Sequence, residues 1–468
     1  MSIKKNIYKA LLIILFGFVS SVEAANKYWT ATNDGTEKLW SNSANWSGGN
    51  GNAPGRKDVA IFNNNGLSSV KLTKNVRVKK LNVLYAYSGT INLDGFQLAS
   101  TKGPLIAGGK VEVNGGFLQA WGWTYIQSGG EVDASGSGSR IKIGHNLTIK
   151  GGTLTAPSGD NTRFIVKGGF NLHDGGVFNH NSGTVTMTPK GKWSGTTGAA
   201  IRIDDGPGTG RNFYNLYKSG PRNVTLTTND IRVLNDITAI GNGKIRAQSN
   251  DITIGGDWDL AKSSNFVAGT GTVIFNGSSA QTIDSPANFK NVQISNSDVS
   301  LLRAATVTGT LTIDSGATLD INGKNLTAGT LANNGNLQLA GGETVSITTK
   351  DTDSGTITYD GTATGLAYGN AYYNLALNTS GTMTLNAALD VNGSLTITEG
   401  TLDAANNDIN VAGNWTNSDS FVSGTGKVTF DGTSNIITGG TGDSNDFYDV
   451  TLSGTSGSQS SVIAIDND

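Results

Sequence analysis

Imperfect internal repeats made of short apolar runs and glycine-rich turns limit this chain to folds built from stacked units. A string that ends in Trp415 (residues 407–415) recurs in register at residues 250–258, where it ends in Trp258. A Val-x-Gly-x-Leu-Thr-Ile string occurs at residues 307–313 and again at residues 391–397. These spacings indicate a repeating unit of about 75–85 residues. We assign four units, at residues 141–218, 231–295, 305–378 and 389–453.

Within a unit the apolar residues alternate with polar ones, which is typical of β-strands. Examples are residues 311–313, 319–321 and 337–339, and turns such as Asn322-Gly323 and Gly341-Gly342 separate such runs. Asn-Gly and Gly-Gly supply the positive φ angles that sharp corners need. Units that look alike but cannot each enclose a core predict an all-β parallel β-solenoid, or β-helix. The alternative is a tandem array of β-sandwich repeats, each of about 80 residues.

Composition excludes several other classes of protein. The chain has 65 Gly but only 7 Pro in 468 residues, and it has no Gly-X-Y period, so it is not collagen. A net charge of −2 is too small for the signature of disorder. Cysteine is absent, which excludes disulfides, thiolate zinc sites and a cysteine nucleophile.

The N-terminus has the features of a secretory signal peptide at residues 1–24. Lys4, Lys5 and Lys9 form a positive region, residues 10–19 form a short apolar core, and residues 22–24 end in a small residue suited to cleavage. We expect maturation after Ala24. Since no later stretch of about 18 apolar residues follows, we predict no membrane span, and localisation at the cell surface or outside the cell.

The following segment is rich in tryptophan and is predicted to cap the solenoid. It covers residues 25–66 and contains Trp29, Trp40 and Trp46, and the solenoid is assigned to residues 67–468. A cap is expected because an open coil end would recruit other strands. Trp258 and Trp415 occupy equivalent positions in two repeats, which favours a packing role for both.

Charge is distributed unevenly along the chain. Residues 1–250 hold 28 of the 34 Lys and Arg and 14 of the 36 Asp and Glu, which leaves 6 and 22 for residues 251–468. The basic residues 1–250 could face an anionic cell surface. A gradual change of charge along a solvated surface, without a function, is the simpler interpretation. The pI near 6.0 argues against a nucleic-acid partner.

The repeat strings also carry a resemblance to a known class of proteins. The strings are G-x-L-T-I-x-x-G-x-L, N-D-I-x-V-x-G-x-W, G-T-G-x-V-x-F-x-G and F-Y-N-L. Together with the tryptophan-rich segment they resemble bacterial exported β-helical repeat proteins, including autotransporter passengers and large surface adhesins. The resemblance implies a β-helical stalk or adhesin, with a glycan or a cell-surface or matrix protein as its partner. The last residues of the sequence align with the beginning of a further repeat unit. We therefore expect this chain to be a fragment of a longer protein.

Catalytic chemistry has little support in the sequence. The three histidines, His145, His173 and His180, lie in different repeat contexts, which argues against a metal trio or a Ser/His/Asp set. We therefore predict that the protein is not an enzyme.

The enzyme alternative is a polysaccharide lyase or hydrolase of the β-helix type. It would use Asp204 and Asp205 to hold Ca²⁺, and one of the basic residues nearby to abstract a proton. Those basic residues are Arg202, Arg211, Lys190 and Lys192. A solvated charged surface would look the same in sequence.

No cofactor is predicted, with weak Ca²⁺ binding as the one exception. Asp443 with Asp446, or Asp351 with Asp353, could supply carboxylate ligands. No Gly-Gly-x-Gly-x-Asp repeat accompanies them.

Trp121, Trp123 and Tyr125 are the best candidates for stacking on a sugar, because indole faces pack on the apolar faces of sugars. Strand alternation would place both indoles on one side, and packing in the core or cap is the simpler interpretation. Function is accordingly predicted as an exported structural or adhesin solenoid, with a carbohydrate-binding repeat array as a further alternative.

Overall fold

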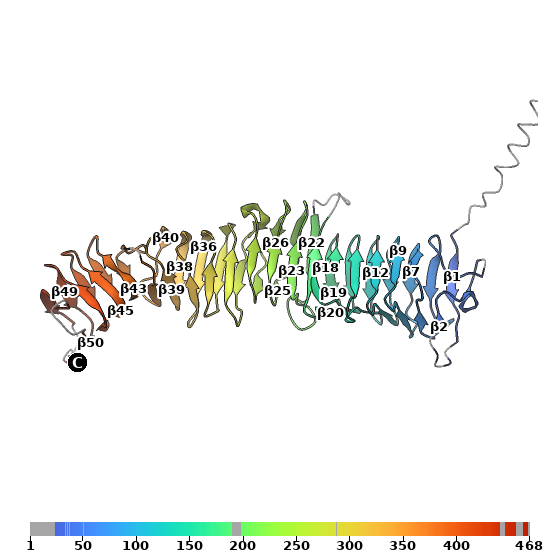
Figure 1. Ribbon diagram of the computed structural model, residues 1–468, viewed down its shortest axis with the longest axis horizontal. Helices are drawn as coiled ribbons and strands as arrows, with labels where there is room; N and C mark the ends of the chain where they lie inside the picture. Colours follow the sequence, from blue (N-terminus) through green and yellow to red (C-terminus); the bar gives the residue numbers. More distant parts are fainter. Residues whose placement is uncertain are drawn as a thin grey trace, which may run out of the picture. The chain divides into compact units, whose positions relative to one another are not determined.

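A computed structural model describes residues 24–468 except 33, 35, 37, 50, 190–197, 287, 363, 440–444, 455–461, 467 and 468. The predicted signal peptide therefore lies outside the described residues apart from Ala24. The described residues form β-strands and two 3-10 helices, η1 (Ser43–Asn45) and η2 (Ser263–Asn265), without an α-helix. Two compact units divide the chain: unit 1 extends to His145 and includes Lys150–Leu154, and unit 2 comprises Asn146–Ile149 and the residues from Thr155 onward. Both are parallel β-solenoids and together contain about 18 turns (Figure 1).

Unit 1 has three sheets, to which each turn of the coil adds one strand, and the first sheet begins with one further strand, Trp46–Ser47, that pairs antiparallel with Asn26–Trp29. The first sheet has the order β3 (Trp46–Ser47), β1 (Asn26–Trp29), β4 (Val59–Phe62), β7 (Lys80–Val83), β10 (Leu105–Ile106) and β13 (Thr124–Gln127). The second has the order β2 (Lys38–Leu39), β5 (Val70–Lys71), β8 (Thr90–Asn92), β11 (Lys110–Glu112), β14 (Glu131–Asp133) and β17 (Thr153–Thr155). The third has the order β6 (Val76–Val78), β9 (Gln97–Ser100), β12 (Phe117–Ala120) and β15 (Arg140–Ile143).

Unit 2 repeats this arrangement with further sheets. One contains β16 (Leu147–Lys150), β19 (Phe170–His173), β22 (Gly198–Ile203), β24 (Asn223–Leu226), β27 (Ile245–Arg246) and β30 (Phe266–Val267). A second contains β25 (Ile231–Val233), β28 (Ile252–Ile254), β31 (Thr272–Phe275), β34 (Asn291–Ile294), β36 (Ala305–Ile313), β38 (Leu326–Asn333) and β40 (Val345–Thr349), with β33 (Asn288–Phe289) paired to β36. A third contains β42 (Ala371–Tyr372), β44 (Leu389–Val391), β46 (Ile409–Val411), β49 (Lys427–Phe430) and β51 (Asp449–Leu452).

The longest row of strands in unit 2 passes through most of its turns. It contains β18 (Gly159–Val166), β21 (Gly183–Met187), β23 (Asn215–Lys218), β26 (Ile237–Ala239), β29 (Trp258–Leu260), β32 (Gln281–Asp284), β35 (Val299–Leu301), β37 (Thr318–Asp320), β39 (Asn336–Leu339), β41 (Thr356–Tyr359), β43 (Asn374–Thr384), β45 (Leu395–Asp403), β47 (Trp415–Asn417), β48 (Ser420–Val422), β50 (Ser434–Thr438) and β52 (Val462–Asp466). The remaining strand, β20 (Val177–Asn179), precedes β21 in the chain.

Strand register shows that successive turns share one core. Leu319 aligns with Leu337, and Leu337 aligns with Ile357, at intervals of 18 and 20 residues. The same apolar row continues through Leu375, Leu395 and Trp415. Neighbouring strands in this row are parallel, so each turn covers the apolar row of the turn before it. The predicted parallel β-solenoid is confirmed, and the alternative of tandem β-sandwiches is wrong because no segment of this row encloses a separate interior.

Tryptophan side chains fill the core at the start of unit 1. Trp29, Trp40 and Trp46 are buried around Phe62, with ring centroids 5.1 Å apart for Trp29 and Trp46 and 4.9 Å apart for Trp40 and Trp46. The Trp29 indole donates to the Ser68 carbonyl at 3.0 Å. These residues form an aromatic interior, and their role as a cap stays a prediction.

No helix among the described residues is long and apolar enough to cross a lipid bilayer. The inward positions of Trp258 and Trp415 agree with the packing role expected from their repeat positions, since their exposed fractions are 0% and 1%.

A buried tyrosine cluster in unit 2 carries the first testable prediction. The hydroxyls of Tyr359 and Tyr372 lie 3.0 Å apart, and the Tyr359 hydroxyl accepts the Tyr368 N–H at 2.9 Å. Burial raises the pKa of Tyr359, so this phenol stays protonated. Removing the hydroxyl by Tyr359→Phe leaves buried groups without a partner, and unfolding in urea should show a loss of about 1–3 kcal/mol. Tyr448→Phe is the control, because this ring is exposed; equal stability losses in the two variants would contradict the prediction.

Candidate functional site

Two exposed indoles mark one corner of unit 1. Trp121 and Trp123 lie in the turn between β12 and β13, and their exposed fractions are 38% and 49%. The other tryptophans of the described chain are buried. The expectation that these two pack in the core or cap is wrong, because they stand in a turn and strand alternation does not apply to them. Exposed aromatic rings of this kind are suited to contact with a ligand.

Close backbone stacking explains why the indoles stay at the surface. A Cβ added at Gly103 would lie 1.9 Å from the Trp123 carbonyl oxygen, and one added at Gly122 would lie 2.2 Å from the Lys102 carbonyl. Gly103 also has a φ of +82°, which favours glycine. The two turns therefore lie backbone against backbone, and no room remains between them for a large side chain.

Neighbouring side chains hold the two rings in different ways. The Arg77 guanidinium carbon lies 4.3 Å from the centroid of the Trp121 ring, a cation-π contact. The half-buried ring of Tyr125, on β13, lies 6.3 Å from that of Trp123. The structure thus brings Trp123 and Tyr125 together, and it adds Arg77, which the sequence interpretation missed.

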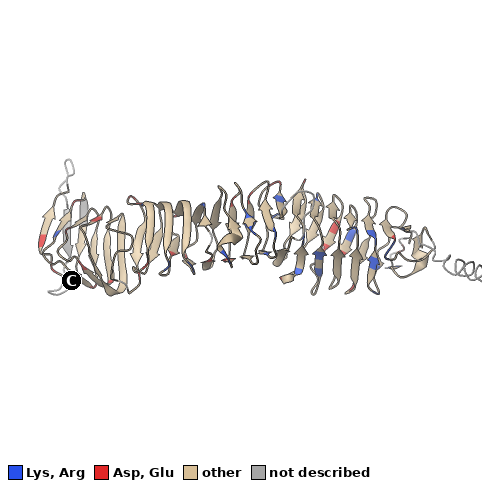
Figure 2. Ribbon diagram, turned by 90° about the horizontal axis from the view of Figure 1, so that it is seen from above, with Lys and Arg blue, Asp and Glu red and all other residues tan. Residues whose placement is uncertain are grey.

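The rings border a sheet surface that carries only positive charge. We call the third sheet of unit 1, the turns that follow its strands and Lys80, the first residue of β7, the basic aromatic face; it is made of residues 76–80, 97–102, 117–123 and 140–143. It contains no Asp or Glu. Its cations are Arg77, Lys79, Lys80, Lys102, Arg140 and Lys142. Figure 2 shows Lys and Arg on many strands of unit 1.

Register explains how this face forms from distant residues. Arg77 aligns with Ala99, Ala99 with Gln119, and Gln119 with Lys142. These steps of 22, 20 and 23 residues were not apparent from the sequence, because the repeat period found there was several turns long. The face could have been found from the sequence if the number of residues in a single turn had been known.

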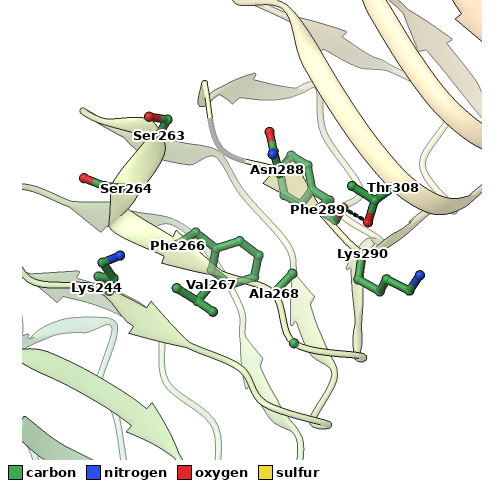
Figure 3. Close-up of a pocket in the computed structure, with 11 residues that line it drawn as sticks. Lys244, Ser263, Ser264, Phe266, Val267, Ala268, Asn288, Phe289, Lys290 and Thr308 are labelled. Atoms are coloured by element: carbon green, nitrogen blue, oxygen red, sulfur yellow. Dashed lines mark hydrogen bonds between the residues drawn. The ribbon is translucent and has the colours of Figure 1, made fainter.

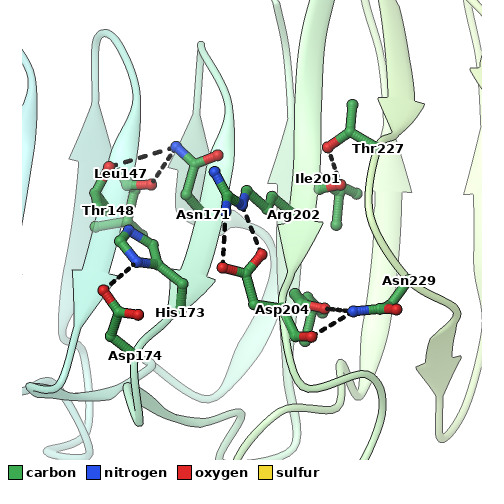
Figure 4. Close-up of polar contacts among 11 residues, drawn as sticks. Leu147, Thr148, Asn171, His173, Asp174, Ile201, Arg202, Asp204, Thr227 and Asn229 are labelled. Carbon is green, nitrogen blue, oxygen red and sulfur yellow. Dashed lines mark hydrogen bonds and ion pairs between the residues drawn. The ribbon is translucent and has the colours of Figure 1, made fainter.

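The charged cluster of the enzyme alternative lies in unit 2 and consists of ion pairs (Figure 4). Arg202 donates to both carboxylate oxygens of Asp204, at 2.6 and 2.8 Å, and Arg211 lies 3.2 Å from Asp205. The hydrogen bond from Arg202 to Asp204 raises the pKa of the guanidinium. Asp204 and Asp205, the expected Ca²⁺ ligands, are therefore engaged by Arg202 and Arg211, two of the residues expected to supply the base. Lys190 and Lys192 lie outside the described residues.

Polar groups around this cluster tie one turn to the next. Asn229 donates its side-chain N–H groups to the Ile203 carbonyl, at 3.0 Å, and to the Asp204 carbonyl (Figure 4). His173 contacts Asp174 at 3.0 Å. His180 stacks on Tyr214, and burial lowers the pKa of both His180 and His145.

The proposed calcium residues give no metal geometry within the described chain. Asp351 accepts backbone N–H groups from Asn333 at 2.7 Å and from Asp353 and Ser354 at 3.1 Å, so it organises a turn. Asp443 lies outside the described residues, and Asp446 lies within them. Among the described residues no three His, Cys, Asp or Glu side chains are arranged to hold a metal ion.

Unit 2 also has an open hollow of about 420 Å³ (Figure 3). Its polar lining comes from Lys244, Ser263, Ser264, Asn288, Lys290 and Thr308. The Thr308 hydroxyl is turned back to the Phe289 carbonyl, at 3.2 Å. The lining contains neither a carboxylate nor an imidazole side chain.

No known protein family, curated protein or solved structure matches this chain at a significant level.

Proposed function

We propose that this protein is an exported bacterial surface or extracellular solenoid, of the structural or adhesin type, that binds glycans through the basic aromatic face. The signal-like N-terminus and the resemblance of the repeats support export. Its fold suits the role, because stacked turns hold a surface in a fixed geometry.

One observation carries the binding part of this proposal: the exposure of Trp121 and Trp123 on a rigid turn. Apolar rings that lie side by side at the surface form a patch, and exposed apolar patches mark contact sites. The close backbone packing at Gly103 and Gly122 already restricts this turn in the unbound protein. Binding of a ligand would therefore cost little conformational entropy of the turn. Sugar rings present apolar faces that fit such indoles.

Replacing Trp121 with Ala should weaken glycan binding by the full chain roughly tenfold or more. The guide is the stacking of a nucleobase on an aromatic side chain, which contributes about 1–3 kcal/mol to binding. Binding would be measured on a glycan array and then by calorimetry with the best glycan. Trp123→Ala should act in the same direction.

Tyr448→Ala is the matched control, since it removes an exposed ring of unit 2 that lies outside the face. Circular dichroism would verify that all variants are folded. Retention of full affinity by the folded Trp121→Ala, Trp123→Ala double variant would refute glycan binding at this face.

A further inference from the structure

We infer that the glycan bound by the basic aromatic face is an anionic polysaccharide, one that carries carboxylate or sulfate groups. This inference rests on the proposed function and adds the chemical class of the ligand. It depends on the charges of the face, whereas the proposed function depends on its exposed indoles.

The cations of the face have no acidic partners. None of the six forms an ion pair with a described acid, and the face itself contains no acid. The second sheet of the same unit is different, since Lys71 pairs with Asp94 at 2.9 Å and Lys110 pairs with Asp133 at 2.7 Å. The clustered like charges repel one another, and a polyanion placed on them would relieve this repulsion.

The cations belong to the first, second and fourth turns of the face, and the aromatic rings belong to the third turn. Arg77, Lys79 and Lys80 belong to the first turn of the face, and Arg140 and Lys142 belong to its fourth turn. Arg77 and Lys142 are three strand spacings apart, about 14 Å. The third turn carries Phe117, Trp121 and Trp123 and no charge. A ligand that spans the face therefore meets cations from the turns on both sides of the rings, and two of these cations lie over the rings themselves.

Aromatic contacts hold two guanidinium groups in place. Besides the contact of Arg77 with Trp121, the Arg140 guanidinium carbon lies 4.9 Å from the centroid of Phe117. An arginine guanidinium that stacks on an aromatic ring keeps its N–H groups free at the edge of the guanidinium plane. There they can donate in pairs to a carboxylate or a sulfate. Both arginines are exposed, so these donors are accessible.

The spacing of charges favours a polysaccharide over a nucleic acid. A nucleic acid has a phosphate at every nucleotide and is matched by a continuous row of cations. Here the third turn supplies no cation of its own, and charge reaches it only through the two arginine side chains that lie over its rings. On the second and third turns, the amides of Gln97 and Gln119 bond to each other at 2.6 Å and present further donors and acceptors suited to sugar hydroxyls.

The test measures binding of the full chain to four probes of similar length: polygalacturonate, dextran sulfate, neutral dextran and single-stranded DNA. We expect binding to polygalacturonate or dextran sulfate, weakened steeply between low and high salt. An Arg77→Gln, Lys142→Gln double variant should lose roughly tenfold or more in affinity and show a shallower salt dependence. Arg303→Gln is the control, because this cation lies in unit 2 and pairs with Asp284. Lys79→Gln is a second variant in case the double variant fails to fold.

The outcomes separate this inference from the proposed function. Binding of neutral glycans that requires Trp121 but is insensitive to salt and to the double variant would overturn the inference and leave the proposed function standing. Preference for DNA over both anionic glycans would overturn the inference as well. Absence of any glycan binding would refute both the inference and the proposed function. Binding of either anionic glycan with the expected losses would support both, and the two probes would distinguish carboxylate from sulfate.

Discussion

Replacing Trp415 with Ala is expected to lower the free energy of unfolding of unit 2 by about 3–5 kcal/mol, the range for removing a fully buried large aromatic ring. Its indole is 1% exposed, and its strand neighbours in register are Leu395 and Ile437. The rings of Phe421 and Phe447 meet it edge to face, with centroids at 4.9 and 5.2 Å. Backbone hydrogen bonds fix the turns on either side, so they cannot close around the space left by the indole.

Unfolding in urea, followed by circular dichroism, would measure the loss. Trp415→Phe should cost clearly less, because it retains an aromatic ring in the same row. Leu302→Ala serves as the surface control, since 45% of Leu302 is exposed. Because each turn depends on its neighbours, the damage should concentrate in the turns that contact Trp415. A loss below about 1 kcal/mol would show that this row does not support the core in the way the register indicates.

The second large effect concerns a lysine inside unit 2. Lys218 is fully buried, in register with Met187 and Ala239, and its ammonium donates to the Gly220 carbonyl at 2.8 Å. Burial lowers the pKa of Lys218 to about 8. Burial in the folded chain therefore disfavours the charged ammonium form of Lys218. Because Lys218 is protonated at neutral pH, its burial destabilises unit 2 there.

The direction of the pH dependence follows from the protons bound in each state. Below about pH 8 the folded and the unfolded chain both hold this proton, so the penalty is constant. Between about pH 8 and 10 the folded chain has released the proton while the unfolded chain still binds it, and stability therefore rises with pH. This group alone should contribute a rise of about 2–3 kcal/mol over that interval.

Lys218→Met removes the titrating group and tests this reasoning. We expect the variant to be more stable than the natural chain at pH 7, and the difference to shrink by about 2–3 kcal/mol between pH 8 and 10. Urea unfolding at several pH values would measure the difference, in which the titration of the buried tyrosines cancels. A difference that stays constant with pH would mean that Lys218 remains protonated in the folded chain.

The basic elements of this fold could be predicted from local sequence. Alternation at residues such as Leu319 and Ile321 shows which side chains point inward, and Asn322-Gly323 marks a corner, because these properties depend on a few neighbouring residues. Equivalent repeat positions also predicted the burial of Trp258 and Trp415. The candidate site could be predicted only in part. Trp121, Trp123 and Tyr125 were recognised, but the rings were expected to be packed because they were assigned to a strand.

The sequence by itself determined that the chain is built from short strands and turns, since alternation and positive-φ turn residues act over a few residues. Tertiary structure alone decided which residues of different turns share a surface. Arg77 and Lys142 are 65 residues apart in the chain, and they lie on one face only because parallel pairing aligns four turns of unequal length. Alignment of this kind depends on how each turn packs on the next, and local sequence does not record it.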